Sequence, residues 1–415
     1  MIRKSLVLKL CEGFTMQRWN DQLRPAELVE IDKQAHKISL AYFLARAVEQ
    51  EESINMSNLI ESAIFEYFER IVISDIKPPV FHKIKADSEQ YKALKLFVKQ
   101  TMIPYMKGLP DIFIHRFSAW CDQEQQDSLE NKILEIAHAD ATLWEFNLLR
   151  HANPDGFGMD EIDKDMDILR RKHADLHQYL RSKLETKHIR QEESDSLFAN
   201  ENYSSYSQLV KMFGQMRFQV RWAQLHRAPK TTVLGHSFYV ALLTYLFSIM
   251  TDACKKRIYN NFWTAVFHDL PEVFTRDIIS PVKSNVSGLG SLIKQIEEEE
   301  IEKKFTNLIP EHLRPELFYF IKDEFADCTF DANTNTVVTY AGGIPVEYNH
   351  KEFNPRDGSL VRFADQFAAF MEADLALKNG AMDPDFTTAK QRIIDKYDNI
   401  KIVGLDLKAF LLDFR

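Results

Sequence analysis

Long apolar segments with helical spacing and few glycines run through most of this 415-residue chain. The main interruptions in the first part are Pro78-Pro79 and the turn-forming sequence Asn153-Pro154-Asp155-Gly156. Residues 155–202 differ, because they first alternate charged and apolar positions and then become polar throughout. The pattern predicts an all-α protein with two helical domains, 1–154 and 203–415, joined by a helical and polar connector.

One segment departs from the helical pattern in favour of strands. Residues 335–349, NTVVTYAGGIPVEYN, place β-branched residues on both sides of Ala-Gly-Gly. This arrangement predicts a small β-hairpin inserted between helices. We expect the hairpin either to form one edge of a binding pocket or to mediate contacts in a homodimer.

The sequence FHDLPEVFTRDIISPVK, residues 267–283, carries the most informative polar residues. His268 and Asp269 follow an apolar helical segment, and Glu272 lies four residues after His268, on the same helix face. An imidazole and a carboxylate at the end of an apolar helix suit a divalent metal with open positions for water. The alternative for such a pair is a capping aspartate beside a core histidine that makes only structural contacts.

Two further segments supply matching residues. His236 stands at the start of the apolar run FYVALLTYLFSIM, so it is expected on the first turns of a buried helix. Asp365 interrupts the apolar helical sequence LVRFADQFAAFMEADL. A carboxylate in such a helix is costly unless it is paired or binds a cation.

The order His236, His268-Asp269, Asp365 on successive helical segments resembles that of the HD-domain metal phosphohydrolases. The resemblance is closest to the 5′-deoxynucleotidase branch. That branch has an Arg-Trp pair fourteen residues before the first histidine, as in Arg221-Trp222, and a Ser-Pro-Val-Lys sequence like the one ending at Lys283. It also has carboxylates matching Glu272 and Asp277. The match extends over residues 203–377.

The resemblance implies one metal bound by His236, His268, Asp269 and Asp365. Glu272 and Asp277 are then the expected acid/base residues, and Arg221, Trp222 and Lys283 the expected substrate-binding residues. Two imidazoles favour Mn²⁺, Co²⁺, Ni²⁺ or Fe²⁺ over Mg²⁺.

The expected reaction is the release of phosphate from a (deoxy)nucleoside 5′-monophosphate by a metal-activated water. Two alternatives remain open on the sequence alone. The first is a nucleotide-binding regulator whose hydrolysis is slow or vestigial, and the second is hydrolysis of a nucleoside triphosphate or a cyclic nucleotide.

The N-terminal domain contains a partial repeat of these features. Arg18-Trp19 precedes His36, which opens another apolar helix, and residues 65–81 resemble residues 267–283 with Glu66-Tyr67 in place of His268-Asp269. Asp140 is expected to match Asp365. These similarities predict a degenerate second HD-like domain that has a structural role or retains weak binding of a metal or nucleotide.

Composition and charge narrow the range of partners. The formal net charge of −9 disfavours a nucleic acid polymer as partner, although a basic pocket for one nucleotide stays compatible with it. Four scattered cysteines without a CxxC pair indicate reduced thiols, and we expect a cytoplasmic protein. No apolar run has the length of a membrane span, so we expect no membrane partner.

The acidic run in IKQIEEEEIEKKF, residues 293–305, has two interpretations. Either it forms a solvated helix face, or one of its glutamates reaches the rim of the metal site.

Overall fold

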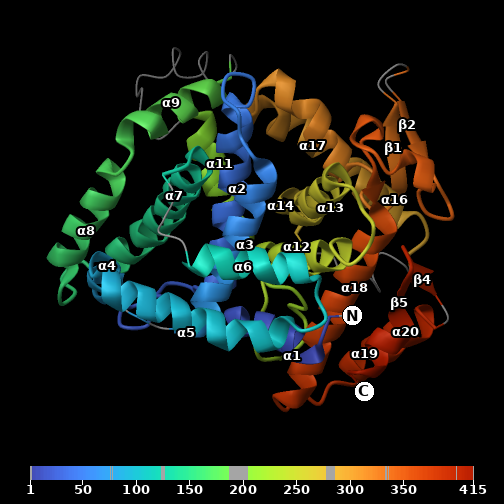
Figure 1. The fold of residues 1–415 in the computed structure, drawn as a ribbon, viewed down its shortest axis with the longest axis horizontal. Coiled ribbons are helices and arrows are strands. Elements are labelled where there is room, and N and C mark those ends of the chain that lie inside the picture. Colours follow the sequence, from blue (N-terminus) through green and yellow to red (C-terminus); the bar gives the residue numbers. More distant parts are fainter. Residues whose placement is uncertain are drawn as a thin grey trace.

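The computed structural model describes residues 2–74, 76, 78–122, 127–186, 204–276, 286–331, 334, 336–398 and 400–414. Helices dominate these residues, with five short strands in two small antiparallel sheets, which confirms the all-α class with a small hairpin. The two ends of the chain lie on the same side of the molecule (Figure 1).

The first part of the chain contains ten helices among the described residues. They are α1 (Lys4–Cys11), η1 (Glu12–Phe14), α2 (Glu30–Val48), α3 (Met56–Ile73), α4 (Pro78–Ala86), α5 (Ser88–Met106), α6 (Asp111–Asp122), α7 (Leu129–Ala152), α8 (Met159–Arg171) and α9 (Ala174–Leu184).

The second part carries the remaining elements. Its first helices are α11 (Ser205–Met216), α12 (Val233–Ser248), α13 (Lys255–Phe267), α14 (Glu272–Thr275) and α16 (Leu289–Glu300). There follow η3 (Ile301–Phe305), η4 (Thr306–Leu308), η5 (Glu311–Leu313), α17 (Arg314–Ile321), β1 (Asp327–Asp331), β2 (Thr336–Thr339), η6 (Val346–Tyr348), η7 (Lys351–Phe353), β3 (Arg356–Asp357), α18 (Gly358–Lys378), α19 (Pro384–Lys396), β4 (Lys401–Ile402), β5 (Leu405–Asp406) and α20 (Leu407–Leu412).

Helices α2 and α12 pack against each other at the centre of the molecule (Figure 1). Every residue of α12 is buried, and Arg46 is the one residue of α2 that is not. Near their N-termini, Thr232 Oγ1 donates to Asp32 Oδ1 at 2.8 Å. A Cβ atom on Gly235 would lie 2.1 Å from the same oxygen, so the two helices can approach this closely only with glycine at that position.

The segments that lead into α2 and α12 have the same backbone hydrogen bonds. Arg18 N donates to Leu28 O and Arg221 N donates to Thr231 O, at 2.8 and 2.9 Å. The isolated bridge between residues 17 and 29 likewise repeats between residues 220 and 232. Both tryptophans that follow the arginines have a positive φ, 53° at Trp19 and 56° at Trp222. We infer an internal repeat in which each α2 residue matches the α12 residue 203 positions later.

This register corrects the sequence-based alignment of the two halves. His36 was expected to match His236, but the matching residue is Lys33, one helical turn earlier. Asp140 was expected to match Asp365, but its carboxylate accepts from the Tyr206 hydroxyl at 2.6 Å, outside any site of that kind.

The first helix of each half packs against the other half. In α1, Cys11 Sγ donates to the hydroxyl of Tyr239 on α12, and Lys4 Nζ donates to the carbonyl of Asp413 near the C-terminus. Conversely, α11 contacts α2 and α7, and Arg217 after it forms a fully buried ion pair with Glu145 at 2.5 Å. One hydrophobic core therefore contains residues from both halves.

The connector has more contacts than its sequence suggested. Helix α9 packs along α2, and its Leu180 and Leu184 are fully buried. Its outer face carries Tyr179 and Lys183, which both bond to Glu51. The polar end of the connector, residues 187–203, lies outside the described residues, so the domain boundaries remain a prediction.

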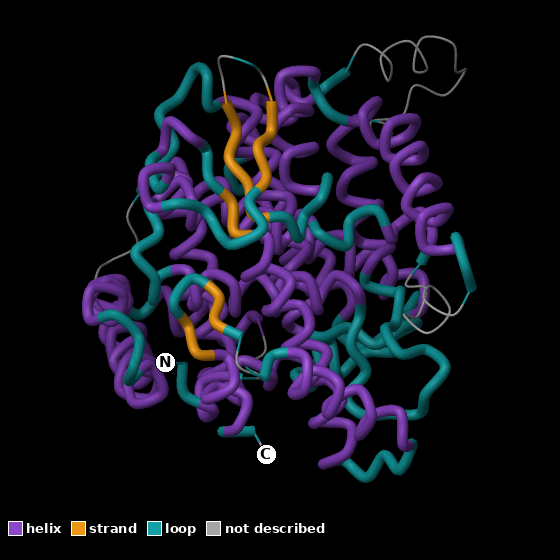
Figure 2. The backbone as a smooth tube through the Cα atoms, turned by 90° about the vertical axis from the view of Figure 1, so that its right-hand side faces the viewer, coloured by secondary structure: helices purple, strands orange, loops and turns teal. Residues whose placement is uncertain are grey.

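The hairpin is present but begins earlier than expected. Strand β1 pairs antiparallel with β2, with Cys328 opposite Thr339, and β3 adds a third short strand beside β1 (Figure 2). The Ala341-Gly342-Gly343 sequence follows the hairpin instead of forming its turn. Pro345 lacks the N–H group that a second strand would need there, and the chain continues as η6.

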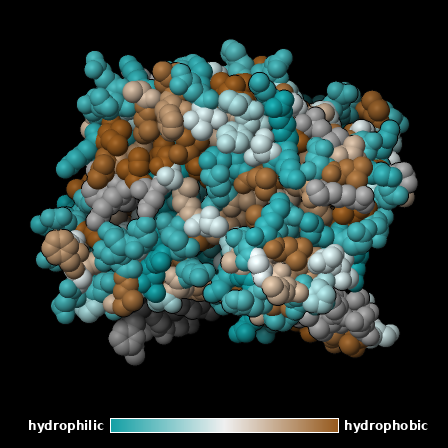
Figure 3. All heavy atoms as spheres, turned by 90° about the horizontal axis from the view of Figure 1, so that it is seen from below, coloured by the Kyte–Doolittle hydropathy of each residue, from teal (hydrophilic) through white to brown (hydrophobic). Residues whose placement is uncertain are grey.

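The surface seen from below is largely hydrophilic, with apolar residues in separate groups (Figure 3). Within the described part of the chain, no helix combines the length and apolar character required to cross a membrane.

Candidate active site

His236 lies in the first turn of α12, whose N-terminus is capped by the Thr232 side chain. Its imidazole is fully buried. The Nδ1 atom is 3.0 Å from Glu372 Oε1, and the Nε2 atom is 3.0 Å from Asp365 Oδ1 and 3.9 Å from Asp269 Oδ2. Because Nδ1–H donates a hydrogen bond to Glu372, Nε2 is the atom that would bind a metal.

His268 follows the last residue of α13, and Asp269 is its neighbour. The Nδ1 atom of His268 donates to the carbonyl of Ala265 at 2.8 Å, which fixes the ring and again leaves Nε2 as the acceptor. This buried Nε2 has no hydrogen-bond partner among the described residues. It lies 3.3 Å from Asp269 Oδ1 and 3.9 Å from Asp365 Oδ1.

The structure therefore brings together all four expected ligand residues. Ligand atoms of His236, His268 and Asp269 lie within 4.8 Å of one another, and Asp365 reaches both imidazoles from α18. Donor atoms about 2.0–2.2 Å from one ion are separated by distances of this order. The donor set, the two oriented imidazoles and the unpaired Nε2 fit a divalent transition metal.

Glu372 is a site residue that the sequence reasoning missed. It lies seven residues after Asp365, two turns along the same face of α18, and this spacing was the available signal. Besides His236, its carboxylate accepts from Trp222 Nε1 at 2.8 Å, Thr231 Oγ1 at 3.1 Å and Arg221 Nε at 3.4 Å. Glu372 thus orients His236 from behind the metal position.

The charges around this pair determine its protonation. Burial raises the pKa of Glu372. The positive charges of Arg221 and His236 outweigh this effect, so the pKa lies well below its ordinary value. Burial and Arg221 lower the pKa of His236, but Glu372 and Asp365 outweigh them and raise it to about 9. This raised pKa favours the protonated imidazole at neutral pH, and a bound metal would take the place of the proton on Nε2.

We predict that Glu372→Gln lowers metal affinity by about 10–100-fold, because the amide orients His236 less well and reduces its basicity. Metal affinity should be measured by competition with a chelator. Glu347→Gln, at an exposed position, is the control and should bind as the unchanged protein does. Equal affinities for all three proteins would exclude the positioning role.

Arg221 and Trp222 were expected to bind substrate. Arg221 lines the pocket beside the metal ligands, with Nη1 3.4 Å from Asp269 Oδ2. Trp222 does not line the described pocket, because its Nε1 is bonded to Glu372 and its ring packs on Phe386 at 5.4 Å. These contacts are those of a positioning residue, and a substrate-binding role for Trp222 stays a prediction.

A pocket of about 610 Å³ opens beside the cluster. Its lining includes His268, Asp269, Glu272 and Asp365, together with carboxylates of the acidic run: Glu297, Glu298, Glu299 and Glu302. The acidic run therefore reaches the site, as the second interpretation proposed.

No described residue of the hairpin lines this pocket, so the homodimer contact remains a prediction. Asp277 and Lys283 lie outside the described residues.

Comparison with known proteins identifies the fold of this region. A family model described as an HD domain matches residues 213–393, which include all four expected ligands. This part of the chain therefore matches the HD-domain family.

Characterised relatives of the HD domain have low identity to it. A 5′-deoxynucleotidase from Pasteurella multocida is 22% identical over 43% of this chain and 78% of its own length. A 4′-phosphooxetanocin A phosphatase from Priestia megaterium is 23% identical over 49% of this chain and 90% of its own. A solved HD-domain phosphohydrolase from Listeria innocua, 17% identical, covers 50% of this chain and 88% of its own, with a TM-score of 0.38.

Proposed function

We propose that this enzyme releases phosphate from a (deoxy)nucleoside 5′-monophosphate, using one divalent transition metal held by His236, His268, Asp269 and Asp365. The observation that carries the proposal is the convergence of two oriented imidazoles and two carboxylates beside an open pocket. The metal, when bound, lowers the pKa of a coordinated water and polarises the phosphoryl group.

Glu272 is the proposed group for proton transfer. It begins α14, four residues after His268, and it lines the pocket without belonging to the cluster of metal-ligand atoms. A carboxylate at this position accepts the proton of the attacking water or returns it to the leaving oxygen. We assign Asp277 to the partner role, as the family resemblance implies.

Arg221 is the proposed phosphate-binding residue. Its guanidinium reaches the pocket while remaining anchored to Glu372 and Asp269. A planar and permanently charged group of this kind suits phosphate oxygens. Lys283 is proposed as a second positive charge.

The monophosphate is favoured over a triphosphate by the charge of the pocket. Its described lining contains three basic residues, Arg221, Lys294 and Lys322, against a larger number of carboxylates. Such a pocket attracts a divalent cation and repels a highly charged polyphosphate. A volume of about 610 Å³ suits a small ligand, and the Pasteurella multocida relative is named a 5′-deoxynucleotidase.

The test is phosphate release by chelator-treated protein to which Mn²⁺, Co²⁺, Ni²⁺, Fe²⁺ or Mg²⁺ is returned. Nucleoside 5′- and 3′-monophosphates, triphosphates and cyclic nucleotides should be compared at equal concentration. We expect metal-dependent release from 5′-monophosphates, preferentially with the transition metals. Absence of release from every monophosphate with every metal would refute the proposal.

We also propose a cytoplasmic location. All four cysteines are unpaired thiols, and three of them are buried. Free thiols in this number are typical of a reducing compartment.

A further inference from the structure

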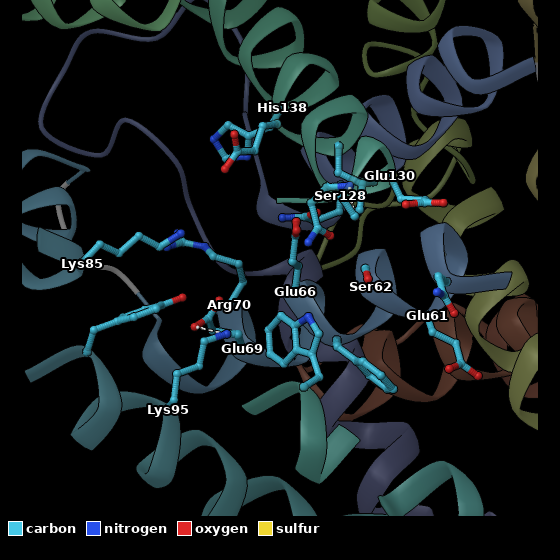
Figure 4. A pocket seen from close by; sticks show the side chains of 18 of the residues that line it. Glu61, Ser62, Glu66, Glu69, Arg70, Lys85, Lys95, Ser128, Glu130 and His138 are labelled. Atoms are coloured by element: carbon cyan, nitrogen blue, oxygen red, sulfur yellow. Dashed lines mark hydrogen bonds and ion pairs between the residues drawn. The ribbon is translucent and has the colours of Figure 1, made fainter. Parts of the chain in front are cut away.

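The N-terminal half contains a cavity of about 490 Å³ bordered by α3, α4, α5 and α7 (Figure 4). Glu66, Arg70 and His138 are among the residues that line it. The internal repeat relates these three residues to residues that line the pocket of the C-terminal half.

The first relation comes from the end of α3. Ser74 N donates to Arg70 O at 3.0 Å, and Arg276 N donates to Glu272 O at 2.8 Å. Ser74 and Arg276 also share a positive φ, 49° and 63°. Arg70 thus matches Glu272, and Glu66 matches His268 by the same offset.

The second relation comes from the glutamate that orients the site. Arg18 and Trp19 bond to Glu145 on α7, with Trp19 Nε1 2.7 Å from Glu145 Oε2, just as Arg221 and Trp222 bond to Glu372. His138, seven residues before Glu145, therefore matches Asp365.

In the N-terminal half, other residues stand at the positions of the metal ligands. The contact between the residues matching His236 and Asp365 is nevertheless present. Lys33 Nζ contacts His138 Nδ1, as His236 contacts Asp365. Tyr67, at the Asp269 position, donates its hydroxyl to the carbonyl of Leu10 at 2.5 Å. An amine and a phenol in place of an imidazole and a carboxylate do not form a transition-metal site.

Two cations of the cavity, Arg70 and Lys85, nevertheless stand outside its short ion pairs. Most of its carboxylates have a basic partner: Glu61 with Arg116 at 2.6 Å, Glu69 with Lys95 at 3.1 Å, Glu135 with Lys172 at 2.9 Å, and Glu66 with Lys37. Arg70 has a longer contact of 3.4 Å with Glu30, and Lys85 has no ion pair within the described residues. The side chains of Arg70 and Lys85 extend toward each other across the cavity (Figure 4). Two like charges held in this way suit an anion between them.

Aromatic rings border the same space. Lys85 Nζ lies 5.0 Å from the ring centre of Phe81 and 5.6 Å from that of Tyr91, and Lys95 lies over Trp120. Phe81, Tyr91 and Trp120 all line the cavity. An anion site beside aromatic planes, in a cavity of this volume, suits a phosphorylated ligand with a ring.

We propose that this cavity binds a nucleoside monophosphate without a metal and without hydrolysing it. Arg70 and Lys85 hold the phosphate, and the arginine stands where the active site has its proton-transfer glutamate. The choice of a nucleotide rests on the function proposed above for the matching pocket, whereas the phosphate contact rests on the cavity itself.

The experiment uses the full chain carrying Asp269→Ala and treated with chelator, so that the C-terminal metal site is disabled. Binding of dAMP should be measured by calorimetry in this protein and in versions that also carry Lys85→Glu or Lys83→Glu. Lys83 is an exposed lysine on the same helix, α4, and does not line the cavity. Deoxyadenosine and inorganic phosphate serve as partial ligands.

We expect saturable binding of dAMP that Lys85→Glu weakens about tenfold or more and Lys83→Glu leaves unchanged. Deoxyadenosine should bind at least tenfold more weakly than dAMP. The proposal would be overturned if dAMP showed no saturable binding. It would also be overturned if both lysine variants bound dAMP as the parent does, or if both lost the same affinity. The binding measurement needs neither a metal nor turnover. Its result therefore does not depend on the outcome of the phosphate-release test.

Discussion

Asp269→Ala is expected to abolish metal binding in the C-terminal half and to reduce phosphate release by roughly 10³-fold or more, since the metal contributes several kcal/mol to transition-state stabilisation. Asp269 is one of four residues that surround the proposed ion, and its carboxylate approaches both imidazoles and Arg221. Elemental analysis should find about one transition metal per unchanged chain and none in the variant.

The control for this variant is Asp252→Asn, which removes an exposed carboxylate between α12 and α13. It should retain both the metal and the activity. Full metal occupancy in Asp269→Ala would show that the assigned ligand set is wrong.

Glu272→Gln is expected to keep the metal and lose rate by roughly 10²–10⁴-fold, because the amide retains the shape of the side chain but cannot transfer a proton. Rate and metal content should be measured on the same preparation. The dependence of kcat on pH should lose the limb that reports this carboxyl group.

Glu298→Gln is the matched control, because Glu298 lines the same pocket from α16. A loss of rate as large as that of Glu272→Gln would mean that both residues act through the charge of the pocket. Loss of metal from Glu272→Gln would instead make Glu272 a ligand.

The metal cluster could be predicted from the sequence because its residues are polar and their neighbours in the sequence are mainly apolar. His236 and Asp365 are polar residues flanked mainly by apolar ones in their helices, and the Arg-Trp pair stood at the spacing of a known family. Glu372 was overlooked because a glutamate near the end of a helix is ordinarily solvated, whereas here it is buried and bonded to four side chains.

The register of the repeat was harder to predict. A shift of three residues turns a helix by about 300°, so His36 lies on nearly the same face as Lys33, one turn away. Hydrophobic periodicity therefore could not distinguish them. What fixes the register is the backbone pairing before α2, and backbone pairing leaves little trace in side-chain identity.

The reciprocal packing of α1 and α11 also bears on how the two halves could have diverged. In a symmetric homodimer, every substitution appears at both sites at once, so a ligand cannot be lost at one site and kept at the other. Joining two such units in one chain removes that constraint, while the helix that each half places on the other keeps the assembly intact. Within one chain, one half can therefore carry Lys33 where the other carries His236.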